Sequence, residues 1–385
     1  MDYLLSENEL MVKDLARKIA EERILPVRAE LDEKEQFPHE IMKVLAESDL
    51  FGLIIPEEYG GFGGGCLINC LAVEEISRVC CGVATSYAAS ALGTYPILLF
   101  GNDDQKKKYL PQLASGKKIA AFALTESTAG SDASGIRTTA ARQADGYLLN
   151  GTKQWITNAG EADIYVIIAI TDRKKGPRGA SAFIVEKGDP GFTFGKKEKK
   201  MGIRSSSTGE LIFSNCLIPA DRLLRREGMG FIAAMHTLDN SRPGVGSQAV
   251  GVAQGALEEA IKYAKERVQF ERPIISFQAV QHMLADMATQ VEAARALVYA
   301  VARFVDSGAK DISKVSAMTK LFATDMAMKV TTDAVQVLGG HGYMRDYPVE
   351  KMMRDAKILQ IYEGTNQIQR NVIGQELNKE FSRKT

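Results

Sequence analysis

The spacing of hydrophobic and polar residues divides this chain of 385 residues into three regions. From residue 7 to about 115 the spacing is helical, and in ENELMVKDLARKIAEERILPVR the residues Leu15 and Ile19 mark one apolar face. Further helices are expected around 67–79, 85–99 and 104–114. The stretch EEYGGFGGG (57–65) is expected to form a loop, because repeated glycine destabilises a helix interior.

Between about 118 and 218 short β-branched or aromatic segments, such as IYVIIAI and GELIFSN, alternate with turn residues. Two dipeptides, Asp145-Gly146 and Asn150-Gly151, are typical of tight hairpins, and the second would place a turn shortly before Trp155. Strands at this spacing predict a small antiparallel barrel or sandwich.

From about 227 onward the pattern is helical again, with long segments around 229–270, 277–307 and 314–338. Long helices joined by short loops indicate a bundle, and the lack of βαβ alternation argues against a Rossmann sheet. The predicted fold class is mainly α with a central β domain. We expect an N-terminal α-helical domain (1–116), a small antiparallel β-barrel or sandwich (117–226) and a C-terminal four-helix bundle (227–385).

Composition narrows the classes of function. Lys and Arg number 48 and so do Asp and Glu, so the net charge gives no attraction to nucleic acid. Five cysteines without a CxxC pair favour reduced thiols. The N-terminus resembles neither a secretory signal nor a transit peptide, and the longest uncharged run (82–100) contains Pro96 and small polar residues, as buried helices do. We therefore expect no nucleic-acid partner, no membrane insertion and a cytoplasmic location, or the mitochondrial matrix if a leader has been removed.

Two common kinds of catalytic site lack support in the sequence. The four histidines are far apart and neither HExxH nor a paired Glu-x-x-His occurs, so no metal site is expected. No GxSxG motif supports a Ser/His/Asp triad. The glycines of 60–65 lack the spacing of a P-loop, which favours a flexible surface turn.

Two segments of the β region carry more specific signals. The stretch FALTESTAGSD (122–132) ends a β run in a turn of small polar residues, which can bind a phosphate or a flat heteroaromatic ring; a solvated β-turn is the alternative. Trp155 is the only tryptophan, and an indole on a strand either packs in a core or stacks on a cofactor, with Thr157 as a hydrogen-bonding neighbour.

Three segments of the C-terminal region raise similar choices. Arg267 in YAKERVQFERPI satisfies helix carbonyls or clamps a pyrophosphate. QVLGGHGY (336–343) ends a helix in a C-cap turn or lets the backbone approach a ligand. Glu363 in IYEGT stands at a turn between an aromatic residue and Gly364, where it is either a surface charge or a base.

The segments ALTESTAGSD, WIT, RVQF, QVLGGHGY and IYEGTNQIQR occur in this order on a helical, β and helical layout. Together they resemble the acyl-CoA dehydrogenase family over nearly the whole chain. The resemblance implies noncovalent FAD between the β domain and the C-terminal bundle, and a thioester of coenzyme A that is dehydrogenated between its α and β carbons. It also implies an electron-transfer flavoprotein as redox partner and a homotetramer built as a dimer of dimers.

The resemblance carries over site residues one by one. Glu363 falls on the catalytic base. The FAD contacts are expected from Phe122, Leu124, Thr125, Gly130, Ser131, Trp155, Ile156, Thr157, Arg267, Phe270, Gln278, Gln336, Val337, Gly339, Gly340, Thr365 and Gln367, in this family partly across a subunit boundary. The substrate contacts are expected from Ser131, Leu238, Asp239, Ser241, Arg242 and Gly364.

The implied chemistry explains the unusual setting of the base. Desaturation removes an α proton while a hydride leaves the β carbon for flavin N5, and donors aimed at the thioester carbonyl stabilise the developing charge. In this family those donors are the N–H of the base residue and a ribityl hydroxyl, which requires a bent backbone. Burial beside an acyl chain should raise the pKa of Glu363. Some members carry the base just before the arginine of the helical segment, where this chain has Ser241, which cannot act as a base.

The acyl group is expected to be neutral, whether short or medium, branched or alicyclic. Val83 and Ala84 stand where a glutaryl-type member should have arginine and serine, and Leu92, Thr94, Tyr95 and Ile97 are candidates for setting the cavity depth. The basic loop TDRKKGPRG (171–179) meets CoA phosphates or is simply solvated. The competing hypotheses are a flavin oxidase or monooxygenase on the same fold, and a catalytically silent CoA- or flavin-binding assembly protein.

Overall fold

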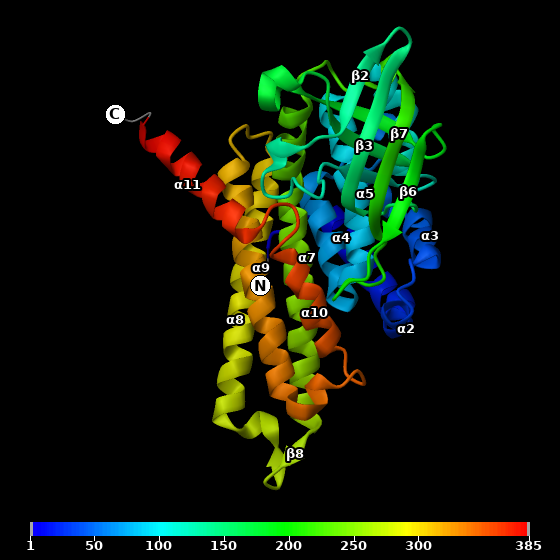
Figure 1. Cartoon of the computed structure of the whole chain (residues 1–385). Helices are drawn as coiled ribbons and strands as arrows, with labels where there is room; N and C mark the ends of the chain where they lie inside the picture. The colour runs from blue at the N-terminus through cyan, green and yellow to red at the C-terminus, as the bar shows by residue number, and fades with distance from the viewer. Residues whose placement is uncertain (1–2, 383–385) are drawn as a thin grey trace.

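A computed structural model describes residues 3–382 and places the N-terminal helices and the C-terminal bundle beside one sheet (Figure 1). The N-terminal helices pack between that sheet and the C-terminal bundle, because α4 and α5 contact α7 while α5 also contacts β1. These helices are α1 (Glu7–Ile19), α2 (Arg28–Glu33), α3 (His39–Glu47), α4 (Gly65–Val79), α5 (Cys81–Phe100) and α6 (Asp103–Ala114). Residues 57–65 form the expected loop, apart from a short 3-10 turn and the first residue of α4.

The sheet forms the middle of the chain. Its strands are β1 (Ala120–Ala123), β2 (Thr139–Gln143), β3 (Gly146–Thr157), β4 (Ile164–Ile170), β5 (Ala180–Glu186), β6 (Phe192–Lys197) and β7 (Thr208–Pro219). The order β1-β4-β2-β3-β7-β6, with β5 also paired to β4, is mostly antiparallel. The sheet differs from the expected antiparallel one because β4 runs parallel to β1 and, at one pair of residues, to β2.

The C-terminal region is a bundle of long helices (Figure 1). Its helices are α7 (Gly230–Glu266), α8 (Gln278–Asp306), α9 (Ser313–Leu338) and α10 (Val349–Leu359), followed by α11 (Asn366–Ser382). A two-stranded hairpin, β8 (Val268–Gln269) with β9 (Arg272–Pro273), joins α7 to α8 at the far end of the bundle. The turn that contains Glu363 joins α10 to α11. The predicted fold class, mainly α with a central β domain, is confirmed.

Of the two hairpin turns predicted from the sequence, the one at Asn150-Gly151 is wrong. The Asp145 turn joins β2 to β3, with Gln143 paired to Gly146. Asn150 and Gly151 instead lie inside β3, where the register with β7 shifts. Gly151 has φ 144° and an added Cβ would lie 2.6 Å from Thr138 Oγ1, so this glycine permits a bulge and a close approach of β2 rather than a turn.

Helix α5 contains the uncharged run. It is long and apolar enough to cross a membrane, yet 67% of its most apolar stretch is buried inside the protein, as in a core helix. Pro96 lies within it. The helix contacts both strand β1 and bundle helix α7, and Glu363 is among the charges that act on its buried Tyr95.

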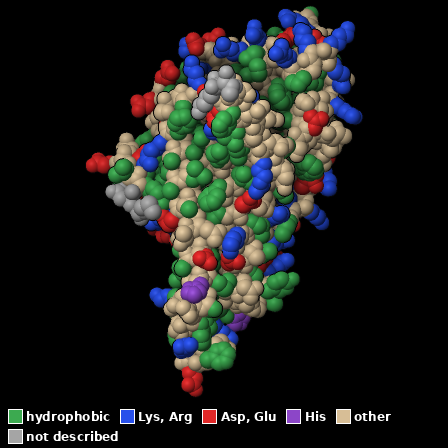
Figure 2. Space-filling view, turned by 90° about the vertical axis from the view of Figure 1, so that its left-hand side faces the viewer, with side chains coloured by type: hydrophobic (Ala, Val, Ile, Leu, Met, Phe, Trp, Pro, Cys, Tyr) green, Lys and Arg blue, Asp and Glu red, His purple; other side chains and the backbone are tan. Residues whose placement is uncertain are grey.

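Hydrophobic and basic side chains gather in different parts of the molecular surface. On the face that Figure 2 shows, hydrophobic side chains gather in the middle, while Lys and Arg side chains concentrate toward the end that holds the sheet. The exposed large apolar side chains of α8, α9 and α11 are Phe304, Phe322, Leu377 and Phe381. An apolar surface of this kind is typical of an interface.

Candidate active site

The turn between α10 and α11 has a strained backbone. Glu363 has φ 52° and Gly364 has φ 93°, so two consecutive residues adopt left-handed conformations. A Cβ on Gly364 would lie 2.7 Å from Gln369 Nε2, so glycine is needed here for packing as well as for its positive φ. A strained glutamate at a turn requires surrounding groups that hold it there.

Side chains from three helices hold this turn. Gln369 Nε2, on α11, donates to the carbonyls of Glu363 (3.2 Å) and Gly364 (2.9 Å). Lys320 Nζ, on α9, donates to the same Gly364 carbonyl at 2.9 Å. Tyr362 donates through its hydroxyl to Gln248 Oε1, on α7, at 2.7 Å. Within residues 3–382 no acceptor binds the Glu363 N–H, which leaves that amide free for a ligand.

The Glu363 carboxylate faces α7. Ser241 Oγ lies 2.5 Å from Glu363 Oε2 and donates to it, with a longer contact of 3.2 Å to the Leu238 carbonyl as its alternative. Burial raises the pKa of Glu363, while the Ser241 hydroxyl and the charges of Arg242 and Lys320 partly oppose that rise. A carboxyl group whose pKa is moved toward neutrality can exchange a proton under ordinary conditions.

The two charged residues beside Ser241 pair with each other. Arg242 Nη1 contacts Asp239 Oδ1 at 2.6 Å, and Ser313 donates to the other oxygen of Asp239. Burial lowers the pKa of Arg242, and its buried Nε has no partner among the described residues. Of the residues expected to line the substrate, Ser241 and Arg242 thus lie next to the Glu363–Gly364 turn, while Leu238 and Asp239 contact these two residues.

A second buried lysine supports the turn that follows β1. Lys153 Nζ, on β3, donates to Glu126 Oε1 at 2.7 Å and to the Leu124 carbonyl at 2.9 Å. Glu126 also accepts from the backbone N–H groups of Arg137 (2.6 Å) and Thr138 (3.0 Å). Burial alone would raise the pKa of Glu126, but Lys153 and Thr138 lower it below its ordinary value, which favours the ion pair. This pair fixes the segment FALTESTAGSD.

Trp155 lies beside that segment and is not a core residue. Its φ is 57° at an irregularity of β3, and 54% of its surface is exposed. The backbone N–H of Gln154 donates to the Thr125 carbonyl at 2.9 Å, which brings the two expected ring contacts together. Nearby, Gln154 Oε1, Asn158 Oδ1 and Thr208 Oγ1 are buried without a partner among the described residues.

These features fit a flat heteroaromatic ring. An exposed indole offers a stacking surface, and unpaired polar atoms offer hydrogen bonds to ring heteroatoms. Phe122 and Thr157 are half-buried and Leu124 and Ile156 are buried around this surface, whereas Gly130 and Ser131 are exposed on the adjoining turn. An added Cβ on Gly130 would meet nothing within 4 Å, so this turn is open to a ligand.

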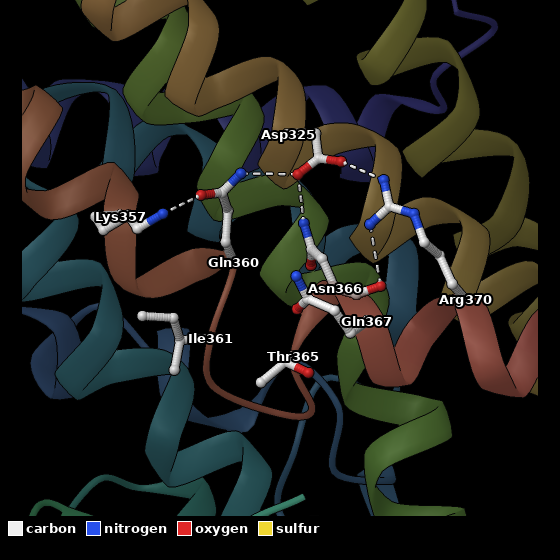
Figure 3. Close-up of a pocket in the computed structure, with 8 residues that line it drawn as sticks. All are labelled: Asp325, Lys357, Gln360, Ile361, Thr365, Asn366, Gln367 and Arg370. Carbon is white, nitrogen blue, oxygen red and sulfur yellow. Dashed lines mark hydrogen bonds and ion pairs between the residues drawn. The ribbon is translucent and has the colours of Figure 1, made fainter.

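A cavity of about 380 Å³ lies beside the Glu363 turn. Figure 3 shows Asp325 among the lining residues, where it accepts hydrogen bonds from Gln360, Asn366 and Arg370. Two expected FAD contacts, Thr365 and Gln367, are among the lining residues. The hydroxyl, the amide and the Arg370 cation suit a polar and anionic portion of a ligand.

The other expected FAD contacts lie far from Glu363. Ser241 lies within α7 and Arg267 directly follows its last residue, 26 positions later. At 1.5 Å per residue the two are about 39 Å apart along the helix. Arg267, Phe270, Gln278, Gln336, Gly339 and Gly340 are exposed around the end of the bundle, while Val337 is buried. The structure therefore does not bring these residues to the ring surface of the same chain. Residues 173–178 of the basic loop are also exposed, whereas Gly179 is buried.

The sequence interpretation missed the residues that support the two turns. Lys320 lies on the buried face of α9 together with Ser316, Ala323 and Ala327. On β3, Lys153 lies an even number of residues from the buried Tyr147 and Leu149, as expected for a side chain on the same face. A lysine at a position whose periodic neighbours are buried is the signal that would have revealed both.

Comparison with known proteins agrees with this arrangement. Models of the acyl-CoA dehydrogenase N-terminal, middle and C-terminal domains match residues 6–117, 121–216 and 228–378. The probable acyl-CoA dehydrogenase FadE25 of Mycobacterium tuberculosis is 50% identical over 375 residues, covering 97% of this chain and 96% of the relative.

Three solved structures are also similar. Butyryl-CoA dehydrogenase from Megasphaera elsdenii superposes with a TM-score of 0.96 and 46% identity, covering 98% of this chain and 100% of that one. A chain in the structure of the electron-transferring flavoprotein of Acidaminococcus fermentans has a TM-score of 0.96 and 50% identity, covering 98% and 99%. Acyl-CoA dehydrogenase complexed with FAD from Bacillus anthracis has a TM-score of 0.92 and 37% identity, covering 99% of this chain and 68% of that one. The protein described here therefore belongs to the acyl-CoA dehydrogenase family.

Proposed function

We propose that the protein is an FAD-dependent oxidoreductase that dehydrogenates a short, neutral acyl-CoA thioester between its α and β carbons, with Glu363 as the base. The observation that carries this proposal is the Glu363 turn. It presents a carboxylate of raised pKa and an unoccupied N–H from one strained residue. A base that also donates its amide to the substrate carbonyl must adopt such a bent backbone.

Glu363, Ser241 and Arg242 have different roles in the proposed reaction. Bound FAD supplies the acceptor for the hydride that leaves the β carbon. Glu363 takes the α proton on its carboxylate, and its N–H is available to the thioester carbonyl, where negative charge develops. Ser241 stabilises the ionised carboxylate before proton transfer and so keeps the base in its active form. The charge of Arg242 is balanced by Asp239, so this ion pair adds no net charge beside Glu363.

The expected FAD contacts form two separate groups on this chain. Thr125, Trp155 and Thr157 would hold the flavin ring, with Thr365 and Gln367 lining the adjoining polar cavity. The group around Arg267 and Gln336, about 39 Å from Ser241 along α7, would serve the FAD of another subunit. This distance and the exposed apolar residues of α8, α9 and α11 support association between subunits, for which the family resemblance implies a homotetramer built as a dimer of dimers.

The residues expected around the acyl group favour a short, neutral chain. Val83 and Ala84 are fully buried and offer no charge to a distal carboxylate. Tyr95 is only 9% exposed. Burial raises the pKa of its hydroxyl, and Glu363 is among the charges that add to this rise, which indicates that the ring lies near the base. A bulky phenol there would end the cavity after a few carbons. The similarity to butyryl-CoA dehydrogenase supports the same size class.

The electrons are proposed to pass to an electron-transfer flavoprotein. This assignment is supported by the 50% identity to a chain in the structure of the electron-transferring flavoprotein of Acidaminococcus fermentans. A flavin oxidase on the same fold would instead pass them to oxygen, and a silent assembly protein would not be reduced by any acyl-CoA.

An anaerobic titration tests the proposal. The purified holoenzyme is mixed with butyryl-, octanoyl-, isobutyryl-, glutaryl- and cyclohexanecarboxyl-CoA while flavin absorbance is followed. We expect butyryl-CoA to bleach the flavin fastest and glutaryl-CoA slowest. Rapid reoxidation of the reduced enzyme by air would point to the oxidase, and no bleaching by any thioester would rule out a dehydrogenase.

A further inference from the structure

Lys320 is a buried cation directly beneath the Glu363 turn. Its side chain has no exposed surface and projects from α9. Its Nζ donates to the Gly364 carbonyl at 2.9 Å and to Asn366 Oδ1 at 2.7 Å. Asn366, the first residue of α11, is itself held by Thr324 and Asp325. One ammonium group thus connects the end of the strained turn with the start of the next helix.

The partners of this ammonium are both neutral. A buried lysine is ordinarily paired with a carboxylate, because an unpaired buried charge is strongly destabilising. Here the nearby carboxylates Asp239 and Asp325 are engaged by Arg242 and Arg370. The remaining carboxylate that interacts electrostatically with Lys320 is Glu363.

We propose that Lys320 is a positioning residue that fixes the Glu363–Gly364 turn through the Gly364 carbonyl and supplies the counter-charge that keeps Glu363 ionised. This inference rests on the proposed function of Glu363 as the base. A neutral side chain could satisfy Gly364 and Asn366, but it could not balance the charge of the carboxylate.

The titration behaviour of the site supports the counter-charge, because a lysine with a pKa of about 7 is positively charged over the acid limb, where Glu363 titrates. Burial lowers the pKa of Lys320 to about 7, and the charge of Glu363 opposes this change. The other groups that interact with Glu363 are Ser241 and Arg242 from α7, Tyr95 from α5 and Tyr362 from the turn. A positive charge lowers the pKa of a neighbouring carboxyl group, so removing Lys320 should raise the pKa of Glu363 and shift the acid limb of activity to higher pH.

The test compares Lys320→Met with Lys329→Met. Lys329 is on the same helix, but it is exposed and pairs with Asp333 at 2.7 Å, so it controls for the loss of one lysine from α9. For Lys320→Met we expect anaerobic flavin reduction by butyryl-CoA to slow by about 10- to 100-fold. The KM should stay within about threefold, and the acid limb of kcat/KM should rise by about half to one pH unit.

A second measurement reports the turn without catalysis. The carbonyl of bound crotonyl-CoA labelled with ¹³C moves downfield when the Glu363 N–H polarises it. We expect this shift to shrink in Lys320→Met while FAD content and crotonyl-CoA affinity stay close to wild type. If Lys320→Met does not fold, Lys320→Gln, which keeps an amide donor on a side chain one atom shorter, replaces it.

The outcomes separate this inference from the proposed function. If wild-type flavin is bleached by butyryl-CoA but Lys320→Met matches Lys329→Met in rate, pH profile and ¹³C shift, the role of Lys320 is overturned. If no acyl-CoA bleaches the wild-type flavin, the proposed function itself fails, whatever Lys320 does.

Discussion

Ser241 and Glu363 are 122 positions apart in sequence, yet the Ser241 hydroxyl donates to the Glu363 carboxylate over 2.5 Å. The family resemblance implies two positions for the base, one at each of these residues. This chain has the glutamate at the turn and a hydroxyl at the helix. The second position therefore supports the carboxylate instead of competing with it.

Replacing Glu363 with glutamine should stop proton abstraction while preserving the shape of the site. We expect the rate of anaerobic flavin reduction by butyryl-CoA in Glu363→Gln to fall by at least about 10²- to 10⁴-fold. FAD content and the affinity for crotonyl-CoA should stay close to wild type, because the amide keeps the volume and the Ser241 contact. Bleaching at the full wild-type rate would show that another residue is the base.

Removing the Ser241 hydroxyl should change the pH profile more than the maximum rate. A hydrogen bond to the ionised form lowers the pKa of a carboxyl group, so Ser241→Ala should raise the pKa of Glu363 further. We expect the acid limb of kcat/KM to move upward by about half to one pH unit. Ser247→Ala is the control, because Ser247 is buried on the same helix and its hydroxyl has no partner among residues 3–382. An identical pH profile for the two variants would contradict the role of Ser241.

Breaking the Lys153–Glu126 pair should weaken both folding and FAD retention. Lys153 has no exposed surface, so Lys153→Met leaves a buried carboxylate without its cation and should lower the free energy of unfolding by about 3 to 5 kcal/mol. The segment FALTESTAGSD loses its support, and the ratio of FAD to protein should fall. Urea denaturation and flavin absorbance measure the two effects.

The exposed ion pair of Lys108 with Glu186 offers the matched control. Its lysine is 51% exposed, so Lys108→Met should change the free energy of unfolding by no more than about 1 kcal/mol. Equal losses for the Lys108 and Lys153 variants would mean that burial of the Lys153 pair does not matter.

Shortening the side chain at position 95 should deepen the acyl cavity. In Tyr95→Ala we expect the ratio of kcat/KM for octanoyl-CoA to that for butyryl-CoA to rise by about tenfold or more, because each methylene group that fits contributes about 1 to 3 kcal/mol. Leu99→Ala, at an exposed position of the same helix, should leave the ratio unchanged. An unaltered preference in Tyr95→Ala would place the end of the cavity elsewhere.

Sequence patterns were sufficient for the architecture, and the family resemblance supplied the candidate base, but neither revealed the contacts that hold the two turns. Helical spacing predicted α7, α8 and α9 closely, because long amphipathic segments leave little ambiguity. Asn150-Gly151 was misassigned because its local turn preference is overridden by pairing with β7 and by the approach of Thr138. Lys320 was overlooked because its partners are a backbone carbonyl and Asn366, which no sequence spacing reveals.

The left-handed backbone of Glu363 makes the residue that would give the most stable fold at this position different from the residue that dehydrogenation needs. A side chain with a Cβ at φ 52° is disfavoured by about 1 to 2 kcal/mol, and glycine is free of this penalty. Glu363→Gly should therefore unfold at a higher temperature than Glu363→Ala, although both lack the carboxylate. A library selected only for heat resistance, without substrate, would accumulate glycine at this position and lose dehydrogenation in the same step.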